Sequence, residues 1–228
     1  MKKNKLRTSL IGLLATASFS GVAAESFDIS VIGTITPAAC KATIAGGNTF
    51  DYGTILAGSL SQDDFTVLPE KTTGFSITCE APAKMGIQTV DNRSGTKVNP
   101  VGKSLAGLVI TETSAIMGLG TDPAGNKIGA YVAAIPDSSV RVDTADAAEN
   151  IFSRDSGITW IKSTDNQTLF VNNSNIFSWT KVGEKTPLAF KVLNGEIKLQ
   201  AAIAPASTLN LTQPIQLDGS ATVQLYYL

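Results

Sequence analysis

The sequence contains no histidine and only two cysteines. Histidine is the commonest general base and metal ligand in proteins, so its absence excludes the usual Ser–His and Cys–His catalytic pairs and the common zinc sites. Charged residues make up only 16% of the chain, and 18 basic residues nearly balance 19 acidic ones. Without a basic surplus the chain lacks the electrostatic signature of a nucleic-acid-binding protein. We therefore expect no enzyme activity, no metal, no cofactor and no nucleic-acid partner.

Long apolar runs are also scarce, and the one near the N-terminus is short. A basic stretch at residues 2–7 precedes an apolar run at residues 10–19, and residues 22–24 are Val-Ala-Ala. This is the three-part layout of a secretory signal peptide. The apolar run is shorter than the ~20 residues that a transmembrane helix needs. We expect residues 1–24 to be removed and the rest of the chain to be exported.

The two cysteines are Cys40 and Cys79. In an exported protein an isolated cysteine pair predicts a structural disulfide. Such a bond would close a loop of about 40 residues, to which the chain-entropy model assigns about 4 kcal/mol of stability. The sequence therefore predicts a covalent link close to the start of the exported chain.

Apolar and polar residues alternate along most of the chain, and helical periodicity is almost absent. Short alternating runs bounded by Gly, Asn, Asp, Ser and Pro are typical of β-strands, and many of them in series indicate a β-sandwich or a barrel. Asn194-Gly195 predicts a hairpin turn, and only residues 145–149 suggest a turn of helix. We expect strands over residues 75–79, 87–90, 105–113, 127–135, 177–182, 188–192, 197–203 and 221–227.

The first residues after the signal peptide form an alternating stripe between residues 25 and 35. In an extended strand one face of this stripe would be apolar and the other mostly polar. One interpretation is an ordinary first strand of the protein's own sandwich; the other is β-strand addition, in which the stripe completes the sheet of another molecule. The pattern alone leaves both open. The apolar face would carry Phe27, Ile29, Val31, Gly33 and Ile35.

A second alternating run lies at the C-terminal end, after the turn at residues 218–220. An apolar strand at an exposed sheet edge invites pairing with another strand, although an ordinary last strand has the same pattern. The alternating positions are Ala221, Val223, Leu225 and Tyr227, followed by Leu228.

The order of these features resembles that of the bacterial chaperone–usher fimbrial subunits (pilins), most of all a divergent fimbrial-like branch. The similar features are the signal peptide, the stripe with glycine at its fourth position, the motif Pro37-Ala38-Ala39-Cys40, the second cysteine at the end of residues 75–79, and the penultimate Tyr227. Residues 51–60 and Asp91-Asn92-Arg93 are also similar to that branch. The resemblance covers both ends and about the first 95 residues, whereas residues 105–183 match only loosely.

This resemblance implies an all-β, immunoglobulin-like, pilin-type sandwich that is incomplete because it lacks its last strand, with extra hairpins in the middle. The implied organisation is a signal peptide (1–24), a donor-strand extension (25–36) and the sandwich (37–228). A periplasmic chaperone would fill the gap until, at an outer-membrane usher, a neighbouring fimbrial subunit donates its extension. The chain would pass through the periplasm into a cell-surface fimbrium that supports adhesion. The implied chaperone and groove edge is Ala221, Val223, Leu225, Tyr227 and Leu228, and the implied donor strand is the stripe ending at Ile35.

A monomeric, lectin-like exported adhesin is the alternative class, and in it the N-terminal stripe would pair within its own domain. Aromatic side chains on loops can stack on sugars, and the two tryptophans are Trp160 and Trp179. Because tryptophan in a sandwich usually packs in the core, we predict core positions for both. Asp63-Asp64 and Glu70 lie in polar, turn-like segments, which predicts solvated charge rather than catalysis.

Overall fold

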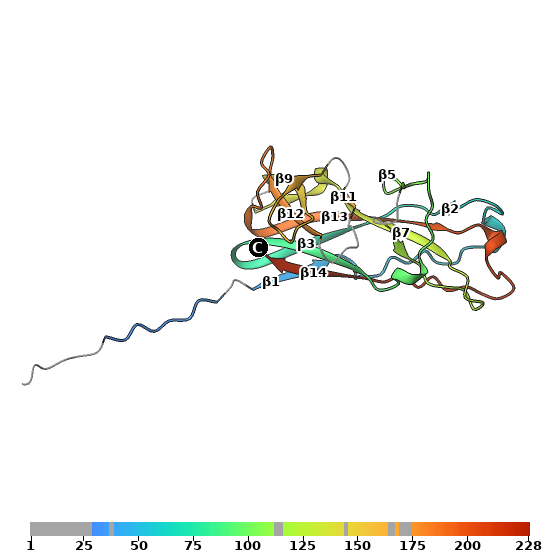
Figure 1. The fold of residues 1–228 in the computed structure, drawn as a ribbon, viewed down its shortest axis with the longest axis horizontal. Coiled ribbons are helices and arrows are strands. Elements are labelled where there is room, and N and C mark those ends of the chain that lie inside the picture. The colour runs from blue at the N-terminus through green and yellow to red at the C-terminus, as the bar shows by residue number, and fades with distance from the viewer. Residues whose placement is uncertain (1–28, 37–38, 112–115, 144–145, 164–166, 169–174) are drawn as a thin grey trace, which may run out of the picture. The chain divides into compact units, whose positions relative to one another are not determined.

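The computed structural model describes residues 29–36, 39–111, 116–143, 146–163, 167–168 and 175–228. The chain divides into two units, Met1–Thr36 and Pro37–Leu228, and each is described by itself. In the first unit, residues 29–36 belong to no strand. The second unit, which we call the body, consists of β-strands and short 3-10 turns, and its described residues contain no α-helix (Figure 1). The all-β prediction is therefore confirmed.

The long strand β3 (Lys71–Asp91) takes part in both sheets of the body. Its first half belongs to the first sheet, where it pairs antiparallel with β1 (Cys40–Ile44) on one side and with β13 (Ala189–Ile203) on the other. Beyond β3, β13 pairs with β7 (Gly129–Ile135). The remaining strands of this sheet are β2 (Thr66–Val67), β6 (Met117–Gly118), β8 (Arg141–Val142) and β11 (Gln167–Thr168).

The second half of β3 belongs to the second sheet, where it lies between β14 (Ala221–Tyr227) and β12 (Ile176–Lys181). Next to β12 come β9 (Asp146–Ser153) and β10 (Ile161–Lys162). Within the described residues, β14 and β1 each pair with β3 alone, so both are edge strands. The other short elements are β4 (Ser104–Leu105), β5 (Leu108–Val109) and the 3-10 turns η1 (Ala57–Ser59), η2 (Ser94–Thr96), η4 (Asp137–Ser139) and η5 (Ala206–Thr208).

The main core of the body lies between the two sheets. Trp179 of the second sheet is 1% exposed and packs edge-on against Phe190 of the first sheet, with ring centroids 5.9 Å apart. Ile77 and Ile87 join the same cluster from the two halves of β3. Burial of such side chains is the main favourable term in folding, at about 1.5–3 kcal/mol for each one. The immunoglobulin-like, incomplete form of this sandwich stays a prediction.

A second, smaller core lies on the other face of the first sheet. Leu105 and Ile110 pack there against Ala130 and Ala134 of β7, and all four are essentially inaccessible. The sequence predicted one buried strand over residues 105–113. The structure instead has the hairpin β4–β5, because Ala106 and Gly107 both adopt positive φ angles, of 50° and 82°, and reverse the chain.

The predicted hairpin at Asn194-Gly195 is wrong, because β13 runs straight through both residues. Gly195 lies opposite Phe75 of β3, and a Cβ atom at position 195 would lie 2.7 Å from the Phe75 ring. Gly195 therefore makes room for the Phe75 ring and does not form a turn. The predicted strands 188–192 and 197–203 are consequently one strand, as are the predicted strands 75–79 and 87–90.

The helical turn suggested for residues 145–149 is also wrong, since Asp146 begins strand β9. Residues 146–147 pair with β8 and residues 148–153 pair with β12, which satisfies the backbone of this strand. Tertiary pairing has overridden a weak local helical preference.

Candidate functional site

A disulfide joins β1 to β3. Cys40 lies directly opposite Cys79 in the strand register, and the two sulfur atoms are bonded. The backbone N–H of Cys40 donates a hydrogen bond of 3.0 Å to the hydroxyl of Tyr227, near the end of β14. Both strands pair with β3, so the start of β1 and the end of β14 meet at the middle of β3. The covalent link thus lies at the junction of the two edge strands.

The inner face of β14 is largely uncovered. Leu225 and Tyr227 lie opposite Ile87 and Met85, which belong to the main core. Their own face should therefore be buried if the sandwich were closed over it. Instead Tyr227 is 48% exposed, Val223 is 47% exposed and Leu225 is only partly buried. The predicted edge residues thus form an apolar ladder that nothing in the described chain covers.

Among the described residues, no backbone group pairs with the outer edge of β14. The N–H of Leu228 donates to the carbonyl of Lys84 at 3.1 Å, and the carbonyl of Ser220 accepts from Asn92 at 3.0 Å. In an antiparallel pair, alternate residues direct both backbone groups to the same side. The even-numbered residues therefore bond to β3, and residues 221, 223, 225 and 227 direct their groups outward. The same residues carry the uncovered apolar side chains.

Residues 45–56 follow β1 and residues 209–220 precede β14, and neither segment contains an assigned strand (Figure 1). Past these segments the two parts of the chain are hydrogen-bonded to each other, because the N–H of Ala206 donates to the carbonyl of Ser61 at 2.9 Å. Among the described residues no backbone hydrogen bond joins residues 45–60 to residues 208–226. We call residues 45–60 and 208–220, together with β14, the open seam. Its half-buried apolar side chains against the core are Phe50, Tyr52, Ile55, Leu60, Leu209, Ile215, Leu217 and Leu225.

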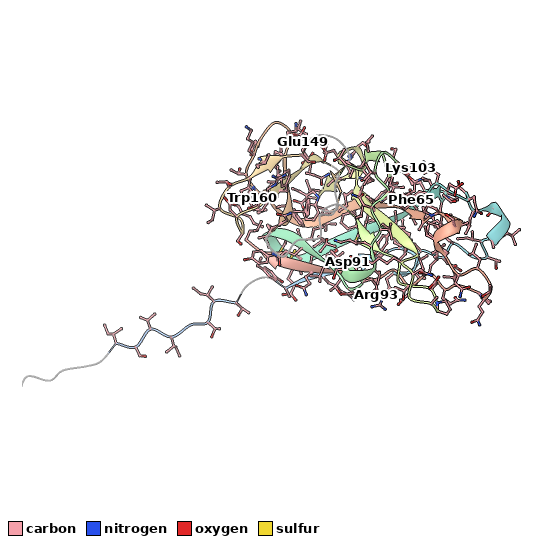
Figure 2. All side chains as sticks on the ribbon, turned by 45° about the vertical axis from the view of Figure 1, so that its right-hand side comes forward. Phe65, Asp91, Arg93, Lys103, Glu149 and Trp160 are labelled. Carbon is pink, nitrogen blue, oxygen red and sulfur yellow. A yellow bond between two sulfur atoms is a disulfide. The ribbon has the colours of Figure 1, made fainter. Side chains whose placement is uncertain are left out.

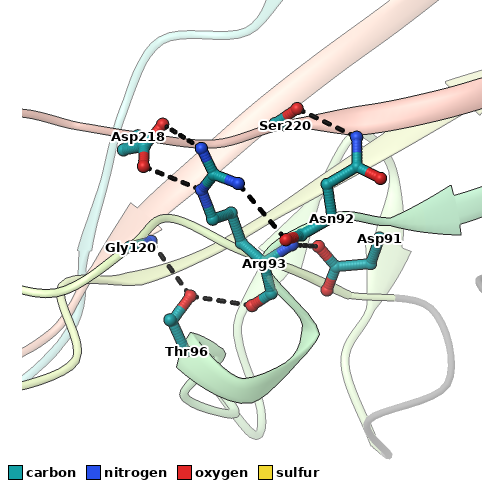
Figure 3. A network of polar contacts seen from close by, with 7 residues as sticks. All are labelled: Asp91, Asn92, Arg93, Thr96, Gly120, Asp218 and Ser220. Carbon is teal, nitrogen blue, oxygen red and sulfur yellow. Dashed lines mark hydrogen bonds and ion pairs between the residues drawn. The ribbon is translucent and has the colours of Figure 1, made fainter.

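One wall of the open seam is fixed by a polar network, shown in Figure 3. The Arg93 guanidinium binds the Asp218 carboxylate through two bonds, Nε–Oδ2 at 2.7 Å and Nη2–Oδ1 at 2.9 Å. This partner lowers the pKa of the Asp218 carboxyl below its ordinary value. Asn92 donates from Nδ2 to the Ser220 hydroxyl at 3.0 Å. The loop after β3 therefore holds the residues that lead into β14.

The same loop, which follows β3, is also hydrogen-bonded to the segment around β6. Asp91 is 8% exposed, and its carboxylate accepts the N–H groups of Arg93 at 2.8 Å and of Gly118 at 3.1 Å. The Thr96 hydroxyl donates to the carbonyl of Arg93 and accepts the N–H of Gly120. Sequence reasoning singled out Asp91-Asn92-Arg93 only as a similarity. The partners of Asn92 and Arg93, Ser220 and Asp218, lie 128 and 125 positions away, and no local sequence signal connects them.

The predicted donor residues all belong to the first unit, and Phe27 falls outside the described residues. Ile29, Val31 and Ile35 are almost fully exposed, and Gly33 has no neighbouring atom within 4 Å of the Cβ position it lacks. An apolar face of this size in water carries a solvation cost that burial would remove.

The two tryptophans differ. Trp179 lies in the core, as predicted. Trp160 does not, and the prediction for it is wrong: it is half-buried in the turn between β9 and β10, where it lines a surface pocket (Figure 2). The indole N–H donates to the carbonyl of Gly157 at 3.1 Å, which holds the ring at the surface.

The described residues were also compared with the requirements of a metal site and of a membrane-spanning helix. In the described part of the chain no three His, Cys, Asp or Glu side chains come together as a metal-binding group. No helix among those residues is long and apolar enough to cross a membrane.

Over its described residues the protein is thus an all-β body in which two edge strands, β1 and β14, pair with one long strand, and β14 borders an apolar seam. A family described as "Protein of unknown function (DUF1120)" matches residues 29–132, from the exposed stripe into β7. The chain is similar to Protein GltF of Escherichia coli K12, with 29% identity over 251 residues covering 100% of this chain and 99% of GltF. It is also similar to Uncharacterized protein YhcF of the same organism, with 27% identity over 238 residues covering 95% and 98% of the two chains.

Proposed function

We propose that this protein is a non-catalytic structural subunit of a surface fimbrium, in which each subunit receives a β-strand from its neighbour. The observation that carries the proposal is the open seam. On β14, outward backbone groups and uncovered apolar side chains belong to the same residues, Val223 and Tyr227 among them. A strand added there would gain a backbone ladder and an apolar contact together, which is the chemistry of β-strand addition.

The exposed N-terminal stripe has the pattern of the strand to be donated. Burying the four side chains of Phe27, Ile29, Val31 and Ile35 would contribute about 6–12 kcal/mol before ordering costs, at about 1.5–3 kcal/mol each. Because Gly33 has no side chain, the backbone of the donated strand could lie close to the open seam at that position, as glycine allows in strands. Donor and acceptor therefore match in periodicity and in polarity.

The proposal includes the partners that such an edge requires. An unpaired apolar edge promotes aggregation, so a subunit of this kind needs a periplasmic chaperone until the neighbouring subunit arrives. Assembly would follow at an outer-membrane usher, and the product would be a fimbrium at the cell surface that supports adhesion. The Cys40–Cys79 disulfide is suited to an oxidising compartment.

Deletion of residues 25–35 tests the proposal, in cells that contain the chaperone and the usher. The truncated chain keeps the acceptor edge but has no strand to donate. Its export and signal-peptide cleavage should therefore be normal, but it should fail to extend fibres. If the truncated chain enters surface fibres as efficiently as the full chain, the proposal is wrong.

A matched pair of substitutions in the full chain separates strand donation from general damage. Val31→Asp places a charge on the apolar face of the stripe, whereas Ser30→Asp places the same charge on its polar face. We expect fibre incorporation to fall sharply for Val31→Asp and to stay near the wild-type level for Ser30→Asp. Equal effects of the two substitutions would contradict donation in this register.

The alternative function is a self-complete monomeric adhesin. It is distinguished by purifying the chain without residues 1–24 in the absence of a chaperone. A self-complete sandwich would be a stable monomer at any concentration, whereas a subunit with an open seam should be less stable and should aggregate as its concentration rises.

A further inference from the structure

A surface pocket of about 370 Å³ lies where the end of β14 meets the turn between β9 and β10. This volume is at the lower end of the range of small-ligand sites, about 300–1,000 Å³, and suits one sugar ring. Three aromatic residues line the pocket, Trp160, Tyr226 and Tyr227, and the hydroxyl of Tyr227 accepts a hydrogen bond from Cys40. The pocket is therefore both small and unusually aromatic for a chain with 7% aromatic residues.

Tyr226 and Leu228 of the pocket lie on the opposite face of β14 from the open seam, whereas Tyr227 belongs both to the pocket lining and to the seam. Tyr226 is paired with Gly86, one position away from the pairs that face the core, so its side chain points to the outer face. Leu228 has the same parity and also lines the pocket. A strand added at the edge of β14 would leave this outer face free, so the inference does not rest on strand donation.

The turn that carries Trp160 is held in one conformation. Ser156 and Gly157 both have left-handed backbones, with φ of 59° and 92°. The Ser153 hydroxyl accepts the N–H of Gly157 at 2.7 Å and donates to the Asp155 carboxylate at 2.6 Å. A non-glycine residue with positive φ is uncommon and is often found at binding sites, where surrounding bonds maintain it. Trp160 is thus presented at the surface by an ordered turn rather than by a loose loop.

The chemistry of the lining indicates the kind of ligand. Indole and phenol faces carry negative partial charge and attract the C–H bonds on one face of a pyranose ring. The hydroxyl of Ser156 and the ammonium of Lys84 can bond to ring hydroxyls. Among the described residues that line the pocket, Lys84 has the only charged side chain, and an ammonium forms its strongest bonds with carboxylates.

We propose that this pocket binds a pyranose that carries a carboxylate, as uronic and sialic acids do. Trp160 and Tyr226 stack on the ring, and Lys84 pairs with the acid group. Each copy of the chain would then present a binding site for acidic glycans on the outer face of its second sheet.

The test uses the full exported chain and two probes, methyl glucuronide and methyl glucoside, followed by tryptophan fluorescence and by ligand-observed NMR. Trp179 is buried, so quenching would report Trp160. We expect the glucuronide to bind about tenfold more tightly than the glucoside, the ratio that one charge-assisted bond supports. Lys84→Gln should remove this preference, and Trp160→Ala should abolish binding of both sugars.

Ile158→Ala is the matched control, because Ile158 is 81% exposed in the same turn but does not line the pocket. It should leave both affinities unchanged. Tyr226→Ala provides a second stacking variant if Trp160→Ala disturbs the turn, and near-ultraviolet circular dichroism of Trp179 checks the fold. Equal binding of the two probes, or no response to either at millimolar concentrations, would overturn the inference.

Discussion

Arg93 and Asp155 illustrate how single side chains organise the surface of this protein. Each lies at the centre of a hydrogen-bond network. Arg93, in the loop after β3, holds the segment that leads into β14, and Asp155 holds the turn that carries Trp160. Figure 2 shows Arg93 and Trp160 well apart on the body, so the two networks are separate. Neither network could be predicted from the sequence, because a single Asp or Arg in a turn usually indicates only solvated charge.

Substitution of Arg93 should loosen one wall of the open seam. Arg93→Ala removes both bonds to Asp218, and Arg93→Lys keeps the charge but loses the paired geometry. We expect faster backbone hydrogen exchange in residues 209–220 for both variants, with the larger effect for alanine. Lys103→Ala is the control, since it breaks another surface ion pair, with Asp64, and should leave this exchange unchanged.

The turn that carries Trp160 should be sensitive only to strong acid. Hydrogen bonds from Ser153 and Thr159 lower the pKa of Asp155 from 3.8 to about 2. Because the folded state prefers the ionised form, the stabilisation is complete above the ordinary value of 3.8 and is lost as the pH falls through about 2. Trp160 fluorescence in a Trp179→Phe background should therefore stay constant down to about pH 3 and change below it. Asp155→Asn should change that fluorescence already at neutral pH, and a flat profile shared by both proteins would contradict the assigned role.

At the scale of elements, β14 matters most, because its two faces and its edge have different neighbours. Its odd-numbered residues face the core side and its even-numbered residues face the outer pocket, while its outer edge is unpaired in the described chain. The alternation at residues 221–227 predicted this strand correctly. Its position beside β3, and the bond between Tyr227 and Cys40, depend on pairing between distant segments and could not be read from the strand itself.

Charge substitutions on β14 should separate the two faces. Val223→Asp puts a carboxylate on the inner face, where an added strand would bury it, and Gln224→Asp puts one on the outer face. Burial of an unpaired charge is strongly unfavourable, so Val223→Asp should greatly weaken binding of a peptide comprising residues 25–36. Gln224→Asp should have little effect in the same peptide-binding titration. Similar losses for both would argue against an added strand at this edge.

At the scale of the whole molecule, the body has a buried main core but an uncovered rim along the open seam. Trp179 and Phe190 are almost inaccessible, whereas Phe50 and Leu217 at the seam are only half-buried. The protein should therefore be less stable alone than with the seam occupied. A ligand that binds only the folded state stabilises it in proportion to the logarithm of its concentration.

A chain lacking residues 1–36 should be stabilised by the peptide of residues 25–36. At a peptide concentration of 100 times its dissociation constant, linkage gives about 2.7 kcal/mol of added stability. Thermal unfolding monitored by circular dichroism measures this shift, and a peptide with Val31→Asp is the control. An unchanged unfolding midpoint with the wild-type peptide would show that the seam does not take this strand.

The amino-acid sequence was enough to predict the all-β class, most of the strands and the core position of Trp179, because alternation is a local consequence of a strand with two different faces. It also marked Cys40 and Cys79 as partners, since no other cysteine exists. Long-range packing, in contrast, makes β13 continue through Asn194-Gly195, brings Arg93 to Asp218 and leaves Trp160 at the surface. Each of these depends on contacts between segments far apart in the chain, which local propensity does not encode. Alternation at the two ends of the chain was visible in the sequence, and the structure places β14 at an edge of the body, where among the described residues it pairs with β3 alone.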